Sequence, residues 1–323
     1  MSRQQMHAAV LHGTGRTPRY ELFPAPVPGD GEAVVTVTAA ALKPSDRLMA
    51  AGVHYAPETF PQVAGLDGVG RLADGSRVAF LPPQRPYGGM AEQALVRRGM
   101  WLAVPDGVAD VTAAAFANPG MAAWKTIVWE GELTAGQRVL VLGATGTSGR
   151  IAAQLARSQG AHVVAAGRNQ RVLDQLTAHG VAAAIRVDRP HGELAAAIAG
   201  EGPYDLIVDY LWGGPAEAVF AALTRARTRA GGAPERTRYV LVGMSAGEVA
   251  ALPALALRSA PVLLTGSGIG GPAGLKAAAV AYRSLLERVS AGDIVLDVEP
   301  VPLADVERAW SQAGSDRRMV FVP

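Results

Sequence analysis

The chain has 323 residues, about twice the usual length of one domain, which predicts two domains or one large α/β unit with an insertion. Hydrophobic residues make up 49% and charged residues 18%, a composition typical of folded proteins that excludes an intrinsically disordered chain. The net charge of +2 argues against nucleic-acid or anionic-membrane partners, and the lack of cysteine excludes disulfides, thiolate nucleophiles and Cys-ligated metal sites.

The first residues and the longest apolar run lead us to expect neither a signal peptide nor a membrane span. Residues 1–7 lack the apolar core of a signal peptide. The longest apolar run, residues 249–257, is shorter than the ~20 residues that a membrane span needs and contains Pro253. We therefore expect a cytoplasmic protein.

The first third of the chain consists of short β-rich segments separated by Gly and Pro residues. We expect strands over residues 8–11, 33–38, 68–72, 77–81 and 91–96. This pattern predicts a barrel-like or α+β region.

From about residue 118, strands alternate with helices of 10–15 residues, which indicates right-handed βαβ units and a parallel sheet. The six expected strands cover residues 139–143, 162–166, 183–187, 205–209, 239–243 and 262–266. Residues 228–238 are predicted to form a solvated loop. The pattern indicates a doubly wound Rossmann domain.

The last part of the chain predicts a helix over residues 272–290, a strand near Val298, a helix over residues 303–312 and a final strand over residues 319–322. Such a β element after the last Rossmann strand suggests that the chain returns to its first domain. The predicted fold class is α/β. Its β-rich domain comprises residues 1–117 and 268–323, and its dinucleotide-binding domain comprises residues 118–267.

A glycine-rich turn with the spacing G-x-x-G-x-x-G follows the strand at residues 139–143 and precedes a helix. Glycines let backbone N–H groups approach a pyrophosphate, whose charge is favoured at a helix N-terminus. This context predicts a dinucleotide site, although a purely structural turn is the alternative. The expected contacts are Thr145, Gly146, Thr147, Ser148 and Gly149.

The end of the next strand predicts which dinucleotide is bound. An acidic residue there would bind the ribose of NAD, but the sequence continues Gly167, Arg168, Asn169, Gln170, Arg171. Since a guanidinium can pair with a 2′-phosphate, we predict NADPH, with contacts from Gly167, Arg168, Asn169 and Arg171. Alternatively, Arg168 is one surface residue among 27 arginines.

Ligands of doubly wound sheets bind beyond the carboxyl ends of the strands. The loops expected to line the nicotinamide half of the site contain Tyr210, Gly243, Met244, Ser245, Ser267 and Gly268. Ser245 is the strongest candidate for a polar contact.

Motifs along nearly the whole chain resemble one protein superfamily. They are residues 28–32, 43–46 with Gly52, 63–70, 74–78, 87–92 and the glycine-rich turn. Together they resemble the medium-chain dehydrogenase/reductase superfamily, in its zinc-free quinone oxidoreductase (zeta-crystallin-like) branch. The resemblance implies a GroES-like catalytic domain, a Rossmann domain, an active site in the cleft between them, and a homodimer.

The lack of cysteine agrees with the zinc-free branch, and the six histidines form no H-x₃₋₅-H pair, so we expect no metal site. Without a Lewis acid, hydride transfer to a quinone or enone is easier than to a simple ketone, because the charge delocalises onto oxygen. We therefore predict an enzyme, an NADPH-dependent quinone or enone reductase acting on a small molecule.

The sequence departs from the superfamily near the expected substrate. The family's N-x-x-D motif has Lys43 in place of Asn and keeps Asp46, while Leu48 and Ala50 stand where members often carry Tyr and Arg. We expect Lys43 to donate to the nicotinamide ribose or to a substrate oxyanion. The alternative is a solvated lysine. If Lys43 has the catalytic role, its replacement by Ala should lower kcat/KM and leave stability nearly unchanged, as at an exposed position.

Tyr55 is the second candidate catalytic residue, as a donor to the developing enolate, with packing as its alternative role.

Two other functions stay open. An enoyl-thioester reductase would use basic residues at the cleft mouth, for which the candidates are Arg47, Arg85, Arg97 and Arg98. The second alternative function is that of a non-catalytic NADPH-binding sensor.

Overall fold

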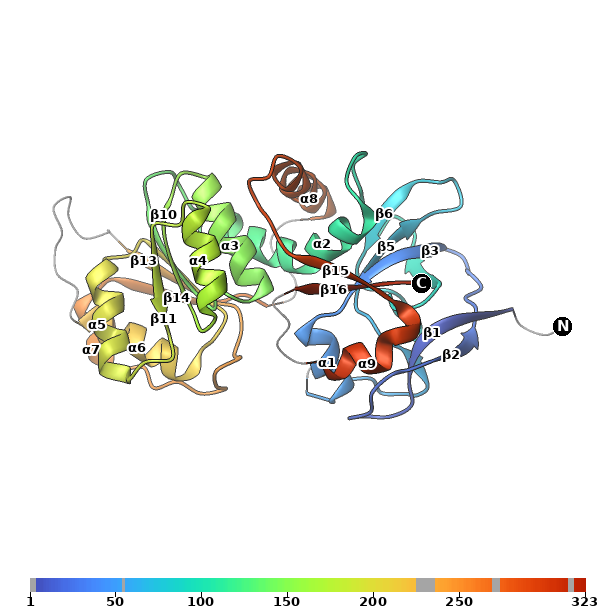
Figure 1. The fold of residues 1–323 in the computed structure, drawn as a ribbon, viewed down its shortest axis with the longest axis horizontal. Helices are drawn as coiled ribbons and strands as arrows, with labels where there is room; N and C mark the ends of the chain where they lie inside the picture. The colour runs from blue at the N-terminus through green and yellow to red at the C-terminus, as the bar shows by residue number, and fades with distance from the viewer. Residues whose placement is uncertain (1–3, 54–55, 225–235, 269–273, 313–316) are drawn as a thin grey trace. The chain divides into compact units, whose positions relative to one another are not determined.

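The computed structural model describes residues 4–53, 56–224, 236–268, 274–312 and 317–323 (Figure 1). The chain divides into two compact units. The first unit comprises Met1–Met121, Ala273–Ser290 and Leu296–Pro323, and the second comprises Ala122–Pro272 and Ala291–Val295. We describe each unit by itself.

The first unit is built on two β-sheets. The larger, seven-stranded sheet has the order β15-β16-β3-β5-β6-β8, with β7 paired to β3, and the smaller sheet has the order β2-β1-β4. The strands are β1 (Gln5–Leu11), β2 (Arg19–Pro24), β3 (Glu32–Ala41), β4 (Gln62–Val63), β5 (Gly68–Arg71), β6 (Arg77–Phe80), β7 (Gln93–Arg97), β8 (Trp101–Ala103), β15 (Val298–Pro302) and β16 (Arg318–Val322). The five strands predicted in this region are confirmed as β1, β3, β5, β6 and β7.

The return of the chain to the first unit is also confirmed. Strand β16 pairs antiparallel with β3, with Val320 opposite Ala41 and Phe321 opposite Ala40. Phe321 is fully buried. The helix predicted over residues 303–312 is a 3₁₀ turn (Leu303–Asp305) followed by α9 (Val306–Ser311).

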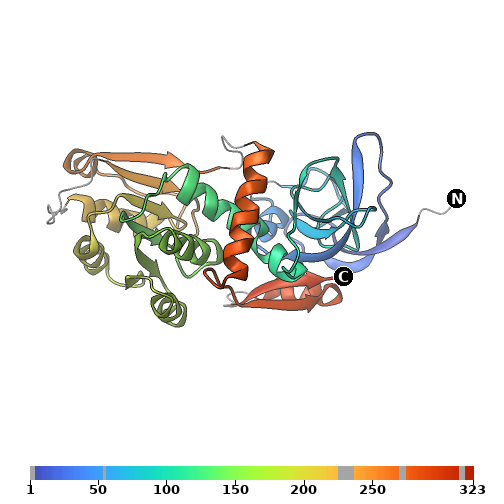
Figure 2. The same cartoon turned by 90° about the horizontal axis from the view of Figure 1, so that it is seen from above.

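The remaining helices that contribute to this unit are α1 (Pro44–Ala50), the start of α2 (Asp110–Trp124) and α8 (Leu275–Ser290). Helix α8 is a single unbroken helix (Figure 2). Residues 272 and 273, where the sequence places its start, lie outside the described residues.

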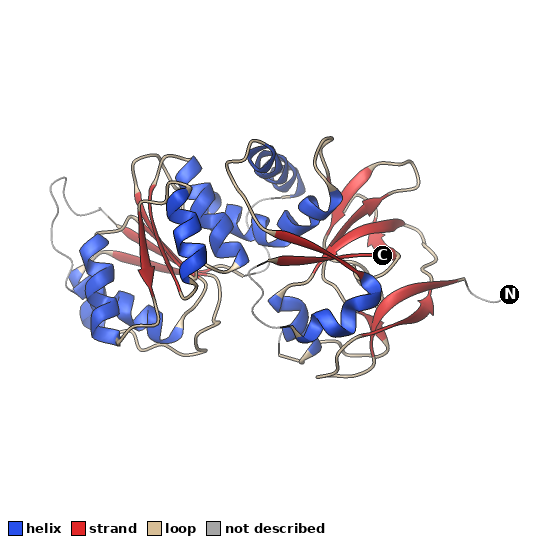
Figure 3. Ribbon diagram, viewed as in Figure 1, coloured by secondary structure: helices blue, strands red, loops and turns tan. Residues whose placement is uncertain are grey.

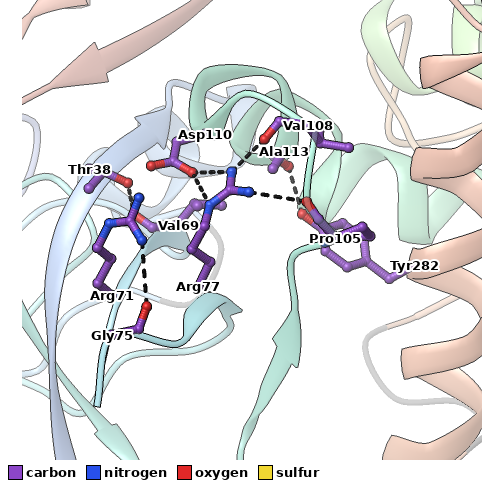
Figure 4. Close-up of polar contacts among 10 residues, drawn as sticks. All are labelled: Thr38, Val69, Arg71, Gly75, Arg77, Pro105, Val108, Asp110, Ala113 and Tyr282. Carbon is purple, nitrogen blue, oxygen red and sulfur yellow. Dashed lines mark hydrogen bonds and ion pairs between the residues drawn. The ribbon is translucent and has the colours of Figure 1, made fainter. Parts of the chain in front are cut away.

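An arginine in β6 anchors the first turn of α2 (Figure 4). Arg77 Nε donates to Asp110 Oδ1 at 3.0 Å, and a terminal nitrogen donates to the carbonyl of Pro105 at 3.1 Å. Burial opposes ionisation of Asp110, but the hydrogen bonds from Arg77 and Thr38 and the positive charge of Arg77 together outweigh it and hold the pKa of this carboxyl below its usual value. The Tyr282 hydroxyl of α8 donates to the carbonyl of Ala113 in α2 at 2.9 Å, so these two helices are joined.

The second unit is a parallel six-stranded sheet of order β11-β10-β9-β12-β13-β14, with helices on both faces (Figure 3). The strands are β9 (Arg138–Leu142), β10 (His162–Gly167), β11 (Ala183–Arg186), β12 (Leu206–Asp209), β13 (Thr237–Leu241) and β14 (Val262–Gly266). All six predicted strands are confirmed. Of the predicted loop, residues 228–235 lie outside the described residues, and residues 237–238 begin β13.

The helices of this unit are α3 (Thr147–Ser158) and α4 (Gln170–Ala178), which pack together, α5 (His191–Glu201), α6 (Gly213–Thr224) and α7 (Ala254–Ser259), and a π-helical turn, η1 (Lys125–Trp129). Helices α5, α6 and α7 share one apolar core with the sheet. In the central strand β9, Val139, Leu140, Val141 and Leu142 are all fully buried, which is why this strand reads as a continuous apolar run. No helix within the described residues is long and apolar enough to cross a membrane.

Residues 291–295 return to this unit and are held by two polar side chains of α3. The Gln154 amide donates to the carbonyl of Val295 at 3.0 Å and accepts from its N–H at 2.9 Å. Arg157 donates to the carbonyl of Asp293 at 3.0 Å. These three hydrogen bonds attach residues 291–295, which are far from α3 in the sequence, to the second unit.

Candidate functional site

The order of the parallel strands reverses between β9 and β12, because the chain runs outward from β9 to β11 and then resumes on the other side. Doubly wound sheets bind their ligands at such a switch point. The loops after β9 and β12 therefore define the candidate site.

The loop after β9 is the glycine-rich turn, and its geometry requires glycine at two positions. Gly143 has φ +82°, and its N–H donates to the carbonyl of Ala166 at 2.8 Å. A Cβ atom at Gly149 would lie 2.2 Å from the Gly143 oxygen. Helix α3 begins after Gly146, which offers no side chain to cap it, so the N–H groups of the first turn can receive an anion.

The other predicted residues of this turn lie around it. A Cβ atom at Gly167, the last residue of β10, would lie 2.4 Å from Thr145 Cγ2, so the turn and the end of β10 are in contact. Thr147 and Ser148 are half-buried in the first turn of α3. The structure thus brings the predicted phosphate-binding residues together.

The segment after β10 places one basic residue at the surface and uses its asparagine in the fold. Arg168 is exposed. Asn169 is the N-cap of α4, where its Oδ1 accepts from the Val172 N–H at 3.3 Å. Asp188, which the sequence analysis did not single out, has a lowered pKa because Arg186 donates hydrogen bonds to it and, to a smaller degree, because Arg168 lies near. Arg171, in the first turn of α4, is exposed.

The loop after β12 is shaped by a buried carboxylate that the sequence analysis missed. Asp209 Oδ1 accepts from the N–H groups of Leu211 at 2.7 Å and Trp212 at 3.0 Å, and Oδ2 accepts from the Tyr239 hydroxyl at 2.5 Å. Burial raises the pKa of Asp209, and these hydrogen bonds oppose the rise. They hold Trp212 in the left-handed region, at φ +55°. The sequence feature that could have identified Asp209 is a single charged residue at the end of the otherwise apolar strand β12.

The predicted nicotinamide residues follow three neighbouring strands at their carboxyl ends. Ser245 Oγ donates to the carbonyl of Tyr210 at 3.0 Å, and a Cβ atom at Gly243 would lie 2.8 Å from the same oxygen. Met244 is exposed. The Ser267 N–H donates to the carbonyl of Leu241 at 2.7 Å, which places residues 267–268 just beyond β14.

Lys43 lies in the first unit and is buried, with 2% of its side chain exposed. Its Nζ donates to Asp67 Oδ1 at 2.5 Å and to the carbonyl of Ala41 at 2.9 Å, and lies 3.2 Å from Asp46 Oδ2. The interpretation of Lys43 as a solvated lysine is therefore wrong, and so is the expectation that its replacement leaves stability nearly unchanged, because that expectation assumed an exposed side chain. Its catalytic role stays a prediction, and its ammonium group already makes two hydrogen bonds and a second ion pair within the protein.

The two carboxylates around Lys43 are buried as well. Asp46 also accepts from the N–H groups of Lys43 at 2.8 Å and Leu66 at 3.0 Å. Burial raises the pKa of Asp67, and the positive charge of Lys43 opposes the rise. Tyr55, the second catalytic candidate, lies outside the described residues.

Comparison with known proteins agrees with this architecture. No family model matches the chain. A quinone oxidoreductase from Pongo abelii is 29% identical over 167 residues, which are 48% of this chain and 51% of that protein. A solved quinone oxidoreductase from Thermus thermophilus, described with its NADPH complex, aligns with 98% of this chain and 100% of its own at 26% identity and a TM-score of 0.80. The chain belongs to the medium-chain dehydrogenase/reductase superfamily, in its quinone oxidoreductase branch.

Membership of the superfamily confirms the predicted fold class, a GroES-like β-rich part together with a doubly wound Rossmann part. The chain spans about half the length of the curated quinone oxidoreductases it matches. The trans-enoyl reductase pgmF from Aspergillus terreus is also 29% identical, over 42% of this chain and 37% of that protein. Among the residues that the structure describes, no three His, Asp or Glu side chains are grouped so as to hold a metal ion.

Proposed function

We propose that the protein is an NADPH-dependent oxidoreductase that transfers hydride, without a metal, to a quinone or an α,β-unsaturated carbonyl compound. The observation that carries the proposal is the glycine-rich turn at the switch point, followed at the end of β10 by the exposed Arg168 in place of a carboxylate. The NADPH complex of the Thermus thermophilus enzyme supports this choice of cofactor.

The residues of the second unit fit the parts of this cofactor. The N–H groups at the start of α3 would hold the pyrophosphate, and Arg168 would pair with the 2′-phosphate. NADPH supplies the hydride when it is bound. Ser245 donates its hydrogen to the protein, so it offers a ligand only the lone pairs of its oxygen. The Tyr210 phenol remains protonated, because burial raises its pKa far above neutrality.

The proposed substrate contacts are Tyr55 and Lys43. An oxyanion would have to compete with two carboxylates, Asp46 and Asp67, that already pair with the Lys43 ammonium. We therefore expect Lys43 to contact the substrate only if the contact is strong enough to replace its pairing with a carboxylate. Backbone N–H groups are the alternative donors to the substrate oxyanion.

The proposed activity is tested by following NADPH oxidation with a panel of quinones, enones and enoyl-CoA esters. We expect turnover with quinones or enones. Turnover restricted to enoyl-CoA would favour an enoyl-thioester reductase, a candidate supported by the similarity to the trans-enoyl reductase. Tight NADPH binding without any turnover would contradict both and indicate a sensor.

The preference for NADPH is expected to depend on Arg168. Arg168→Ala should weaken NADPH binding about tenfold and leave NADH binding nearly unchanged, because a charge-assisted contact to the phosphate is lost. Titration calorimetry with both cofactors measures the two affinities. Arg283→Ala, an exposed arginine of α8, is the matched control. Equal losses for NADPH and NADH in the Arg168 variant would contradict the assignment.

We also propose a homodimer that forms through β14. This strand lies at the edge of the six-stranded sheet, as predicted, and Leu263 and Leu264 are exposed on it. Uncovered edges with apolar side chains favour pairing with a second copy. Ultracentrifugation at micromolar concentration should show a dimer, which Leu264→Lys converts to monomer. Val280→Lys, at an exposed apolar position of α8, should leave the dimer intact. A monomeric parent protein would contradict the proposal.

A further inference from the structure

The π-helical turn η1 (Lys125–Trp129) lies in the second unit and has no role in the function proposed so far. Its wide turn is closed by the Glu130 N–H, which donates to the carbonyl of Lys125, five residues earlier, at 2.9 Å. In an α-helix, side chains five residues apart point roughly 140° away from each other. Here Lys125 Nζ lies 3.2 Å from Glu130 Oε1, so the π geometry brings this ion pair onto one face.

The Lys125 ammonium also reaches the loop after the edge strand β14. Its Nζ donates to the carbonyl of Gly268 at 2.6 Å. The side chains of Lys125 and Glu130 are only 13% and 19% exposed, so water screens these contacts weakly. A hydrogen bond from a charged donor to a backbone carbonyl is one of the stronger hydrogen bonds in proteins. This one connects the π turn to residues 267–268 after β14, called here the Gly268 loop.

The next residue of the turn contacts the loop after β12. Thr126 Oγ1 lies 3.4 Å from the Tyr210 hydroxyl. Thr126 has one hydroxyl hydrogen, which points to the carbonyls of Ala122 and Ala123, both 3.1 Å away. The Tyr210 hydroxyl is therefore the donor in this contact, and burial, helped by the negative charge of Glu130, keeps it protonated.

We propose that Lys125 is a positioning residue for the nicotinamide half of the cofactor, acting from the π turn through the Gly268 loop, with Thr126 acting in the same way on Tyr210. The inference rests on the proposed function, since Tyr210 and Gly268 are the residues that the sequence predicts to line the nicotinamide half of its cofactor site. Glu130 and Gly268, with which Lys125 pairs, are not among the residues proposed to hold the adenosine half. The affinity for the whole dinucleotide depends on this residue, and the affinity for an adenosine fragment does not.

The test compares Lys125→Met with Lys276→Met, which removes an exposed lysine of α8. Calorimetry gives the Kd of NADPH and of adenosine 2′,5′-bisphosphate, which lacks the nicotinamide half. Lys125→Met should raise the Kd of NADPH about tenfold and leave that of the bisphosphate unchanged, and Lys125→Arg should restore most of the affinity. In the unliganded protein, amide hydrogen exchange of residues 262–268 should be faster in Lys125→Met and unchanged in Lys276→Met.

Unchanged NADPH affinity together with unchanged exchange would overturn the inference, and so would equal losses for both ligands. If Lys125→Met does not fold, the near-isosteric Thr126→Val should show the same selective loss for NADPH, and its absence would also overturn the inference. A parent protein that binds neither ligand would instead refute the proposed function. The hydrogen exchange comparison would still test the anchoring of the Gly268 loop.

Discussion

Lys43→Met is expected to lower the free energy of unfolding by about 3–5 kcal/mol, the usual cost of removing one partner from a buried ion pair. The substitution leaves Asp46 and Asp67 with 0% and 1% exposure and without their shared cation. Denaturant unfolding measures the loss. Lys276→Met, at an exposed lysine, should change stability by no more than about 0.5 kcal/mol. A loss in Lys43→Met as small as in this control would contradict the role of the ion pair.

The loss should depend on pH. In the parent protein, burial already raises the pKa of Asp67 and Lys43 opposes the rise, so removal of Lys43 raises the pKa of the folded state further. A carboxyl group with a raised folded pKa destabilises the fold when it is ionised, and this cost disappears when the group is protonated. The deficit of Lys43→Met should therefore be small below the folded-state pKa of Asp67 in the parent protein, which already lies above the ordinary value of aspartate, and it should grow as the pH rises through that pKa toward neutral pH. A deficit that is independent of pH would contradict this explanation.

Gly149→Ala is expected to lower the free energy of unfolding by about 1–3 kcal/mol and to weaken NADPH binding at least tenfold. Its methyl group would lie 2.2 Å from the Gly143 oxygen, so α3 has to move away from the turn whose N–H groups would hold the pyrophosphate. Thermal or denaturant unfolding and calorimetry give the two effects.

Gly146→Ala is the matched control, because its methyl group would lie 3.4 Å from the same oxygen, at an ordinary contact distance. Its backbone φ of −82° is also open to alanine. We expect nearly unchanged stability and a weaker NADPH complex, since a methyl group at the N-cap obstructs the approach of the pyrophosphate. Unchanged NADPH affinity in both variants would show that this turn does not bind phosphate.

The parallel sheet could be predicted from the sequence because burial on both faces makes each strand a short apolar run, as in β9. Strand β2 was missed since it carries Arg19 and Glu21 and ends at Pro24. It lies at the edge of its sheet, where charged residues and proline are tolerated. Its strand pairing is thus not visible in local hydrophobicity.

The glycine-rich turn could be predicted because its chemistry is local, whereas the surroundings of Lys43 could not. Asp67, its partner, is 24 positions away, and only the tertiary fold determines that both side chains are buried together. The π turn at Lys125 is similar, because its lysine and glutamate, five residues apart, are not partners in an ordinary helix.

The pairing of β16 with β3 has a consequence for the order in which the protein folds during synthesis. Strand β3 (Glu32–Ala41) is made long before its neighbour β16 (Arg318–Val322). The N-terminal sheet is therefore synthesised with the carboxyl end of β3 unpaired, and Ala40 and Ala41 lack their partners until β16 has been made. The six-stranded unit is nearly continuous in sequence and lacks only residues 291–295 when residue 272 emerges. A nonsense codon before Arg318 would thus leave the Rossmann unit complete and the first unit with an unprotected edge, a target for proteolysis and aggregation.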